Sequence, residues 1–183
     1  MNGPLALTLA ILLFGAPLLA DTCPPAPDLE PRKSELMAAV RDAPTEAEAR
    51  QLIDELWTLW ATAPDQYSQE LLDEGMDRRS AFDFDGALKA FDALIDYCPN
   101  YAEGYNQRAF INFLREEYAA SLADLDRALA LAPDHIAALS GKALTQIALG
   151  RVDEGQETLR GALALNPWLP ERHLLRPQPG EKL

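Results

Sequence analysis

Cysteine and histidine, on which most metal and redox sites depend, are scarce in this sequence, with two of each among 183 residues. Cys23 and Cys98 do not form a Cys-x-x-Cys motif, which excludes a thioredoxin-like redox site. His135 and His173 have no cysteine, aspartate or serine at the spacing of a zinc site or a catalytic triad, so we expect both to be solvated. Cys23 and Cys98 can pair in an oxidising compartment, and the sequence leaves that disulfide open.

Glycine patterns that bind nucleotides are also missing, since neither a Walker motif nor a dinucleotide-binding motif occurs. The acidic pair Asp83 and Asp85, followed by Gly86, begins like a calcium loop. The third acidic position and the terminal glutamate of such a loop are absent, so a turn between helices is the better interpretation. We therefore expect no metal, no cofactor and no catalytic residues, and we predict that the protein is not an enzyme.

Charged side chains are absent from residues 1–20. An apolar run from Leu5 to Phe14 precedes the helix-breaking Pro17, and the segment ends in the small Ala20, which is typical of a secretory signal peptide. We expect cleavage after Ala20, export to the periplasm or the exterior, and no membrane insertion of the mature chain. An uncleaved anchor is the alternative, although the run is short for a span of roughly 20 residues.

Basic residues are outnumbered, with 16 Lys and Arg against 29 Asp and Glu, which gives a formal net charge of −13. A strongly acidic chain is repelled by nucleic acids and by anionic membrane surfaces, so neither is an expected partner. The charge either keeps the protein soluble or complements a basic partner, and the sequence leaves both open.

An internal repeat is present, because Pro99, Pro133 and Pro167 lie 34 residues apart. Shifting the sequence by this period places large apolar residues on large ones and small residues on small ones, as close packing of helices requires. The aligned sets are Leu71, Tyr105 and Leu139; Gly75, Ala109 and Ala143; Phe84, Tyr118 and Val152; Ala87, Ser121 and Gly155; Phe91, Leu125 and Leu159; and Leu94, Ala128 and Ala162.

Each period holds two helical stretches. In the second period, apolar residues at i, i+3 and i+4 spacing occur on both sides of a charged break at residues 114–117. The proline then ends the second helix, because its ring clashes with the preceding turn and it has no amide to donate. Asn100 and Asp134 follow two of these prolines and are expected to N-cap the next helix. The sequence thus predicts an all-α array of helix–turn–helix units.

This pattern resembles three tetratricopeptide repeats, and the middle repeat matches the family at seven signature positions. The matching residues are Tyr105, Ala109, Tyr118, Ser121, Leu125, Ala128 and Pro133. The first repeat departs from the family with Leu94 at an alanine position, and the third carries Gly155, a poor helix residue. The resemblance implies a helical solenoid with repeats at residues 68–101, 102–135 and 136–169.

Residues 33–67 form a degenerate, repeat-like helical pair that is predicted to cap the array. Thr45 and Glu48 make a capping box at the start of its second helix. Residues 21–32 are a proline-rich leader, and this segment is expected to be extended.

The C-terminal segment, residues 170–183, is too short for the polar final helix that a repeat array usually needs. The apolar residues of the last repeat are then either partly exposed or covered by the end of the chain folding back. They are Leu159, Leu163, Leu165 and Trp168.

In tetratricopeptide-repeat proteins the first helices of the repeats line a concave groove that accepts extended or helical peptides. Carried over by position, the groove residues are Leu72, Met76, Arg79, Asn106, Phe110, Phe113, Ser140, Leu144 and Ile147. The family's carboxylate clamp has Lys and Asn where Leu72 and Met76 stand, so capture of an acidic C-terminus is not implied. The resemblance implies an apolar groove with Arg79 and Asn106 as polar handles, either open to a partner or filled by the chain's own ends.

Two functions follow as hypotheses. The first is a periplasmic or secreted adaptor that binds a protein or peptide through the apolar groove without catalysis. The second is a structural subunit that assembles into homo-oligomers through its weakly capped C-terminal face.

Overall fold

The computed structural model describes residues 22–177, and every element of secondary structure in this range is a helix. The predicted signal segment 1–20 and the tail 178–183 lie outside the described residues. The helices are α1 (Glu30–Asp42), α2 (Glu46–Trp60), α3 (Gln66–Ser80), α4 (Phe84–Tyr97), α5 (Ala102–Leu114), α6 (Tyr118–Leu131), α7 (Ile136–Ala148), α8 (Val152–Leu165) and the 3-10 helix η1 (Pro170–Leu174).

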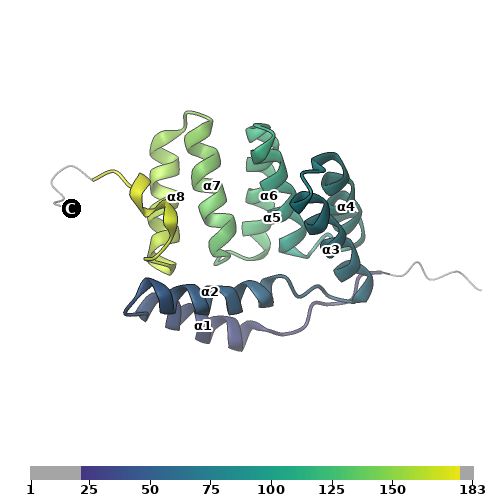
Figure 1. Cartoon of the computed structure of the whole chain (residues 1–183), viewed down its shortest axis with the longest axis horizontal. Coiled ribbons are helices and arrows are strands. Elements are labelled where there is room, and N and C mark those ends of the chain that lie inside the picture. Colours follow the sequence, from purple (N-terminus) through teal and green to yellow (C-terminus); the bar gives the residue numbers. More distant parts are fainter. Residues whose placement is uncertain (1–21, 178–183) are drawn as a thin grey trace, which may run out of the picture.

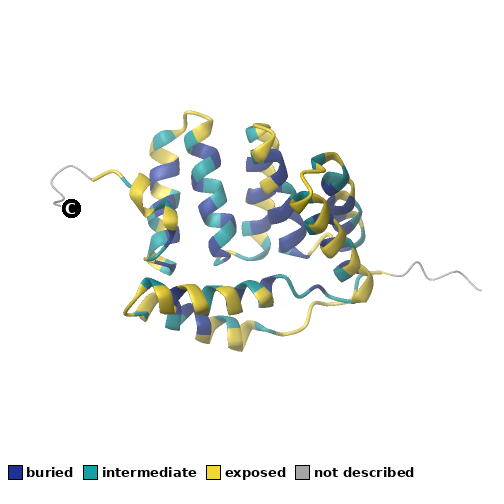
Figure 2. Cartoon of the chain, in the orientation of Figure 1, coloured by how far each residue is buried: buried dark blue, intermediate teal, exposed yellow. Residues whose placement is uncertain are grey.

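Helices α3 to α8 form three antiparallel pairs that stack side by side (Figure 1). Each pair corresponds to one period of the sequence, so the predicted all-α array with an additional N-terminal helical pair is confirmed. Buried residues lie on the inner faces of the pairs, while the tight turns within the repeats are mostly exposed (Figure 2).

The small residues of the period mark places where paired helices approach closely. A Cβ atom added to Gly75 would lie 2.3 Å from the Phe91 ring. One added to Gly155 would lie 2.6 Å from Cγ1 of Ile147 and 2.9 Å from the carbonyl oxygen of Ala143. Gly155 is therefore a poor helix residue at a position in α8 where α7 leaves no room for a methyl group.

The turns inside the three repeats share a left-handed residue one period apart. Phe82, Glu116 and Gly150 have φ angles of 61°, 63° and 78°. Only glycine adopts this region without steric cost, so the first two repeats hold a strained residue where the third has a suited one.

The N-terminal pair α1 and α2 does not extend the stack. It forms a hairpin that crosses the array on the side of the turns between repeats (Figure 1). Its apolar residues Leu36, Leu56 and Trp60 share a buried cluster with Ile136 and Leu169 from the last repeat. The periodicity identifies the apolar faces of α1 and α2, but it carries no information on which surface of the array they cover.

Helix α1 begins inside the predicted leader, at Glu30 rather than Lys33. Pro31 occupies the first turn, where its missing amide hydrogen is not needed and its fixed φ suits a helix. Thr45 caps α2, since its side chain accepts the amide hydrogen of Glu48, but the reciprocal bond of the predicted capping box, from the Thr45 amide to the Glu48 side chain, does not form.

The expectation that Asn100 and Asp134 cap the following helices is wrong. The N-cap positions are one residue later, at Tyr101 and His135. The Nδ1 atom of His135 accepts the amide hydrogen of Ala138 at 3.3 Å, whereas Tyr101 makes no side-chain cap.

The hairpin and the C-terminal turn together cover the last repeat. Leu159 and Leu169 are buried there, and Trp168 Nε1 donates to the carbonyl oxygen of Ala43 at 3.2 Å. Gln156 on α8 donates to the carbonyl oxygen of Leu174 at 3.0 Å and so holds the end of η1. The apolar surface expected at this end is thus covered chiefly by the chain's N-terminal hairpin.

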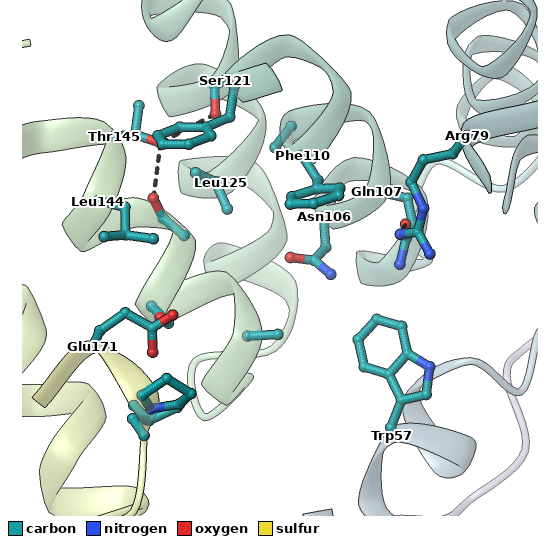
Figure 3. A pocket seen from close by; sticks show the side chains of 17 residues that line it. Trp57, Arg79, Asn106, Gln107, Phe110, Ser121, Leu125, Leu144, Thr145 and Glu171 are labelled. Carbon is teal, nitrogen blue, oxygen red and sulfur yellow. Dashed lines mark hydrogen bonds between the residues drawn. The ribbon is translucent and has the colours of Figure 1, made fainter. Parts of the chain in front are cut away.

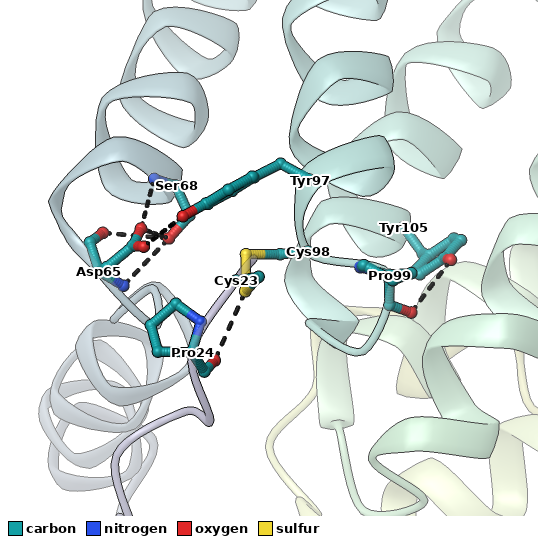
Figure 4. The surroundings of a disulfide bond; sticks show 8 residues. All are labelled: Cys23, Pro24, Asp65, Ser68, Tyr97, Cys98, Pro99 and Tyr105. Atoms are coloured by element: carbon teal, nitrogen blue, oxygen red, sulfur yellow. Dashed lines mark hydrogen bonds between the residues drawn. A yellow bond between two sulfur atoms is a disulfide. The ribbon is translucent and has the colours of Figure 1, made fainter. Parts of the chain in front are cut away.

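A disulfide joins Cys23 to Cys98, with their Cα atoms 5.1 Å apart (Figure 4). It attaches the leader to the turn after α4, close to the start of the array. At that start the hydroxyl of Tyr97 donates to Asp65, the N-cap of α3, at 2.7 Å. The hairpin is therefore tied to the array at one end by a covalent bond and at the other by the contacts around Trp168.

Two glycines in α8 give a matched test of helix packing. Gly161 has no heavy atom within 4 Å of an added Cβ, so Gly161→Ala should raise the free energy of unfolding by about 0.5–1 kcal/mol. Gly155→Ala should lower it by about 1–3 kcal/mol because the new methyl group overlaps α7. Urea denaturation checks both variants, and a Gly155→Ala protein as stable as Gly161→Ala would show that this helix register is wrong.

The disulfide can be tested with the full chain recovered from its native compartment. Alkylation without reductant should label neither cysteine, and both should react after reduction. The bond closes a loop with a sequence separation of 75 residues, for which the chain-entropy model gives a stabilisation of about 4 kcal/mol. Cys98→Ser should therefore lower the urea concentration at the midpoint of unfolding. Labelling of both cysteines in the unreduced, folded protein would contradict the pairing.

Candidate functional site

A cavity of about 370 Å³ opens on the side of the array formed by the first helices of the repeats (Figure 3). Helices α5, α6 and α7 contribute most of its wall, α2 contributes Trp57, and Leu169 with the first two residues of η1 closes another side. The lining residues are Trp57, Arg79, Asn106, Gln107, Ala109, Phe110, Phe113, Ser121, Leu125, Ala137, Ser140, Gly141, Leu144, Thr145, Leu169, Pro170 and Glu171.

Six of the nine predicted groove residues line this cavity. They are Arg79, Asn106, Phe110, Phe113, Ser140 and Leu144. Leu72 lies instead in a fully buried cluster with Ala63 and Tyr101, and Met76 packs against that cluster. Ile147 is half-buried and faces Gly155 on α8. The cavity therefore belongs to the second and third repeats, with Arg79 as the contribution of the first.

Four lining residues come from segments outside the paired repeat helices α3 to α8. Trp57 belongs to the N-terminal hairpin, and Leu169, Pro170 and Glu171 belong to the C-terminal turn. Trp57, Pro170 and Glu171 lie outside the predicted repeats, and Leu169 is the last residue of the third, after its paired helices end. Transfer of groove positions on the first helices therefore could not identify them. The only signal in the sequence was the alternative that the chain's own ends occupy part of the groove.

Phe110 is the most exposed large apolar residue of the cavity, at 45% of its full surface. The guanidinium of Arg79 lies over its ring, 5.4 Å from the centroid, and donates to Oε1 of Gln107 at 2.5 Å. Partial burial lowers the pKa of Arg79, although an arginine stays charged at neutral pH. The stacking and the hydrogen bond hold Arg79 flat against the wall, so the predicted polar handle is already engaged.

A buried polar cluster lies behind the wall and corrects the expectation for His135. That histidine is 1% exposed rather than solvated, and its Nε2 atom is 2.8 Å from Oε2 of Glu103, which is also 1% exposed. Because Nδ1 accepts a backbone amide, the ring proton lies on Nε2 and is donated to Glu103. The second predicted solvated histidine, His173, is exposed, with Nδ1 2.7 Å from the carbonyl oxygen of Pro170.

The remaining acceptor capacity of Glu103 is used by α5 itself. Gln107 Nε2 donates to Oε1 at 2.5 Å, and Asn106 Nδ2 lies 3.3 and 3.2 Å from the two carboxylate oxygens. The second predicted polar handle, Asn106, is therefore directed at Glu103. Together these bonds satisfy a carboxylate that would otherwise be costly to bury.

The N-terminal hairpin excludes water from this cluster. The indole of Trp60 stacks on the imidazole of His135 with centroids 4.3 Å apart and planes 12° apart. The hydroxyl of Tyr101 donates to the carbonyl oxygen of Trp60 at 2.8 Å, and burial raises the pKa of this tyrosine. The cluster thus joins the wall of the cavity to the hairpin.

The hydroxyl groups in the cavity lack the arrangement of a catalytic nucleophile. Ser121 Oγ lies 3.2 Å from Thr145 Oγ1, which donates to the carbonyl oxygen of Gly141. A nucleophilic serine needs a general base at this distance, and a threonine hydroxyl is not one. Across residues 22–177, no group of three or more His, Cys, Asp or Glu side chains is placed to hold a metal ion. The same residues contain no helix with the length and apolar character needed to cross a bilayer.

Comparison with known proteins places the C-terminal part of the chain among tetratricopeptide repeats, whose family model matches residues 113–176. The chain is 40% identical over 65 residues to the tetratricopeptide repeat protein 36 homolog of Nematostella vectensis, covering 36% of each. It is 42% identical over 57 residues to a TPR repeat-containing protein of Rhizobium etli, covering 31% of this chain and 28% of that one. The chain therefore spans about a third of the length of the curated relatives it matches.

Among solved structures, the array is similar to the TPR2B domain of yeast Sti1 in its complex named pHsp70. The TM-score is 0.53 at 28% sequence identity, over 54% of this chain and 78% of that one.

The buried carboxylate can be tested by removing it. Glu103→Ala leaves the donors of His135, Gln107 and Asn106 without their acceptor, so the free energy of unfolding should fall by about 2–4 kcal/mol. Glu157→Ala, on the exposed face of α8, should change it by less than about 0.5 kcal/mol. Urea titration measures both, and a Glu103→Ala protein with the midpoint of the control would contradict the placement of this cluster.

Proposed function

Because this chain is a tetratricopeptide-repeat protein, we propose that it is a non-catalytic adaptor that binds a polypeptide partner in the cavity between α5, α7 and α2. The observation that carries the proposal is the apolar lining around the exposed ring of Phe110, at a place where repeats of this kind present their first helices. The similar TPR2B domain of yeast Sti1, which was solved in a complex, supports a role in protein interaction.

The apolar side chains of the cavity explain how a partner would be held. Phe110, Phe113 and Leu144 lie on adjacent first helices and share one concave surface. Contiguous apolar surface in a concave site is where aromatic and aliphatic anchors of a partner bind, because its burial removes water from both surfaces. A volume of about 370 Å³ suits a few side chains of a peptide rather than a folded domain.

We further propose that the adaptor acts in the periplasm or after secretion. The uncharged apolar segment 1–20 favours export, and the pairing of Cys23 with Cys98 is consistent with an oxidising compartment. The acidic balance favours a protein or peptide over a nucleic acid as the partner.

Assembly of homo-oligomers through the C-terminal face is the weaker candidate. It requires an uncovered apolar end, yet Leu159 is buried and Leu169 lies in a buried cluster with residues of the N-terminal hairpin. Phe110 is exposed inside a concave apolar cavity, which is why the adaptor is the function we favour.

A photo-crosslinking experiment tests this function. With a benzophenone amino acid at position 113, the exported protein should crosslink to a partner segment that mass spectrometry can sequence. The double variant Phe110→Asp with Leu144→Asp should keep its helical signal and lose the crosslink, because binding would bury two unpaired charges. Phe82→Asp is the matched control, since Phe82 is 82% exposed and does not line the cavity.

The outcomes separate the alternatives. A double variant that folds and still crosslinks normally would move the site elsewhere. A double variant that unfolds would show that Phe110 and Leu144 are core residues or are already covered by the chain itself.

A further inference from the structure

The wall of the cavity formed by the C-terminal turn carries a carboxylate without a partner. Glu171, in the first turn of η1, extends into the space beside Leu144 (Figure 3). Its Oε2 atom is buried and has no hydrogen-bond partner among the described residues. A carboxylate oxygen that is shielded from water loses its hydration without compensation unless a donor comes from elsewhere.

The cations near this carboxylate are bonded to other groups. Arg172, the next residue, donates to the carbonyl oxygens of Trp168 and Leu169 and pairs with Glu46 at 2.9 Å. Arg79, the cation that lines the cavity, donates to Gln107 and stacks on Phe110. Glu171 therefore presents a negative charge to whatever fills the cavity.

The neighbours of Glu171 on the cavity wall are apolar. Leu169 and Pro170 precede it in the chain, and Ala137 and Leu144 face the same space from α7. A charge beside such a wall acts more strongly than one in open solvent, because fewer water dipoles screen it. The site thus combines an apolar surface with one fixed anionic position.

The wider charge distribution has the same sign. The chain carries a formal net charge of −13, and α3 exposes an acidic face. That face is formed by Glu70, Asp73, Glu74 and Asp77. Such a field raises the rate at which a basic segment meets the protein and disfavours an acidic one.

We propose, resting on the function proposed above, that the partner segment combines a bulky apolar side chain with a neighbouring lysine or arginine. The apolar side chain fills the cavity against Phe110 and Leu144. The cationic side chain lies along Leu169 and donates to Oε2 of Glu171, which satisfies the buried oxygen. This preference is opposite in sign to that of a groove that captures acidic peptide ends.

Synthetic peptides test this pairing on the full mature chain. Fluorescein-labelled peptides, acetylated at the N-terminus, carry a Leu-Leu-Phe anchor followed at successive positions by lysine, glutamine or glutamate. The best lysine peptide should bind the parent protein about tenfold more tightly than its glutamine counterpart at low salt, and the glutamate peptide should bind more weakly still.

Variants assign the preference to one residue. Glu171→Gln should remove the advantage of lysine over glutamine and leave the affinity of the glutamine peptide unchanged. Glu157→Gln makes the same charge change on exposed α8 and should preserve the advantage. Because Oε2 of Glu171 has no hydrogen-bond partner among residues 22–177, its replacement should not lower the melting temperature.

Failure of this proposal is distinct from failure of the adaptor function. One outcome is that the peptides bind the parent protein and Phe110→Asp abolishes this binding, while the affinity depends neither on Glu171 nor on the charge of the peptide. That outcome would overturn the basic preference alone. If none of the peptides binds, whatever its charge, both the basic preference and the adaptor function at this cavity are contradicted. The same peptides without the acetyl group, and a variant that lacks residues 178–183, complete the comparison. Binding by the unacetylated peptides alone, or only to the shortened variant, would overturn the basic side chain as the group that meets Glu171.

Discussion

The buried carboxylate of Glu103 is the group on which the arrangement of this molecule depends. His135, Gln107 and Asn106 all donate hydrogen bonds to it, which compensates the loss of its hydration in the interior. Trp60 stacks on the histidine and excludes water, so the N-terminal hairpin is needed on this edge of the array. A buried polar cluster of this kind costs stability when any member is missing, which favours one position of the hairpin over others.

The same cluster shapes the candidate binding site. Gln107 donates to Glu103 with its amide nitrogen and accepts from Arg79 with its amide oxygen. Arg79 in turn lies against Phe110, the exposed ring of the cavity. The hairpin that covers the cluster also brings Trp57 to the opposite side of the cavity. The hydrogen bonds that position the hairpin therefore also determine the shape of the surface offered to a partner.

The sequence predicted the repeated part of the fold because its prolines and small residues recur with a period of 34 residues. Gly75, Ala109 and Gly155 are small for the reason that the pattern indicates, since their helices leave no space for larger groups. Six of the nine predicted groove residues line one cavity for the same reason, because a repeat presents equivalent residues to equivalent surroundings. Leu72, Met76 and Ile147 do not line the cavity, and Leu72 is buried in a cluster with Ala63 and Tyr101 instead.

What the sequence could not predict are contacts between segments that do not repeat. His135 was expected in solvent because its partner, Glu103, lies 32 residues away and forms no motif with it. Trp57 and Glu171 reach the cavity from opposite ends of the described chain, and neither belongs to the period. Their positions follow from how the hairpin and the C-terminal turn pack, which periodicity does not specify.

Native-state hydrogen exchange, followed by mass spectrometry on the intact chain, tests most directly whether the hairpin is an integral wall of the site. If Trp60, His135 and Glu103 join the hairpin to the repeats, amides of α2 and α5 should exchange together, in the slowest and most cooperative class. Complete exchange in residues 46–60 while residues 102–114 stay protected would contradict the account. It would mean that the hairpin opens independently and that the cavity lacks the wall described here.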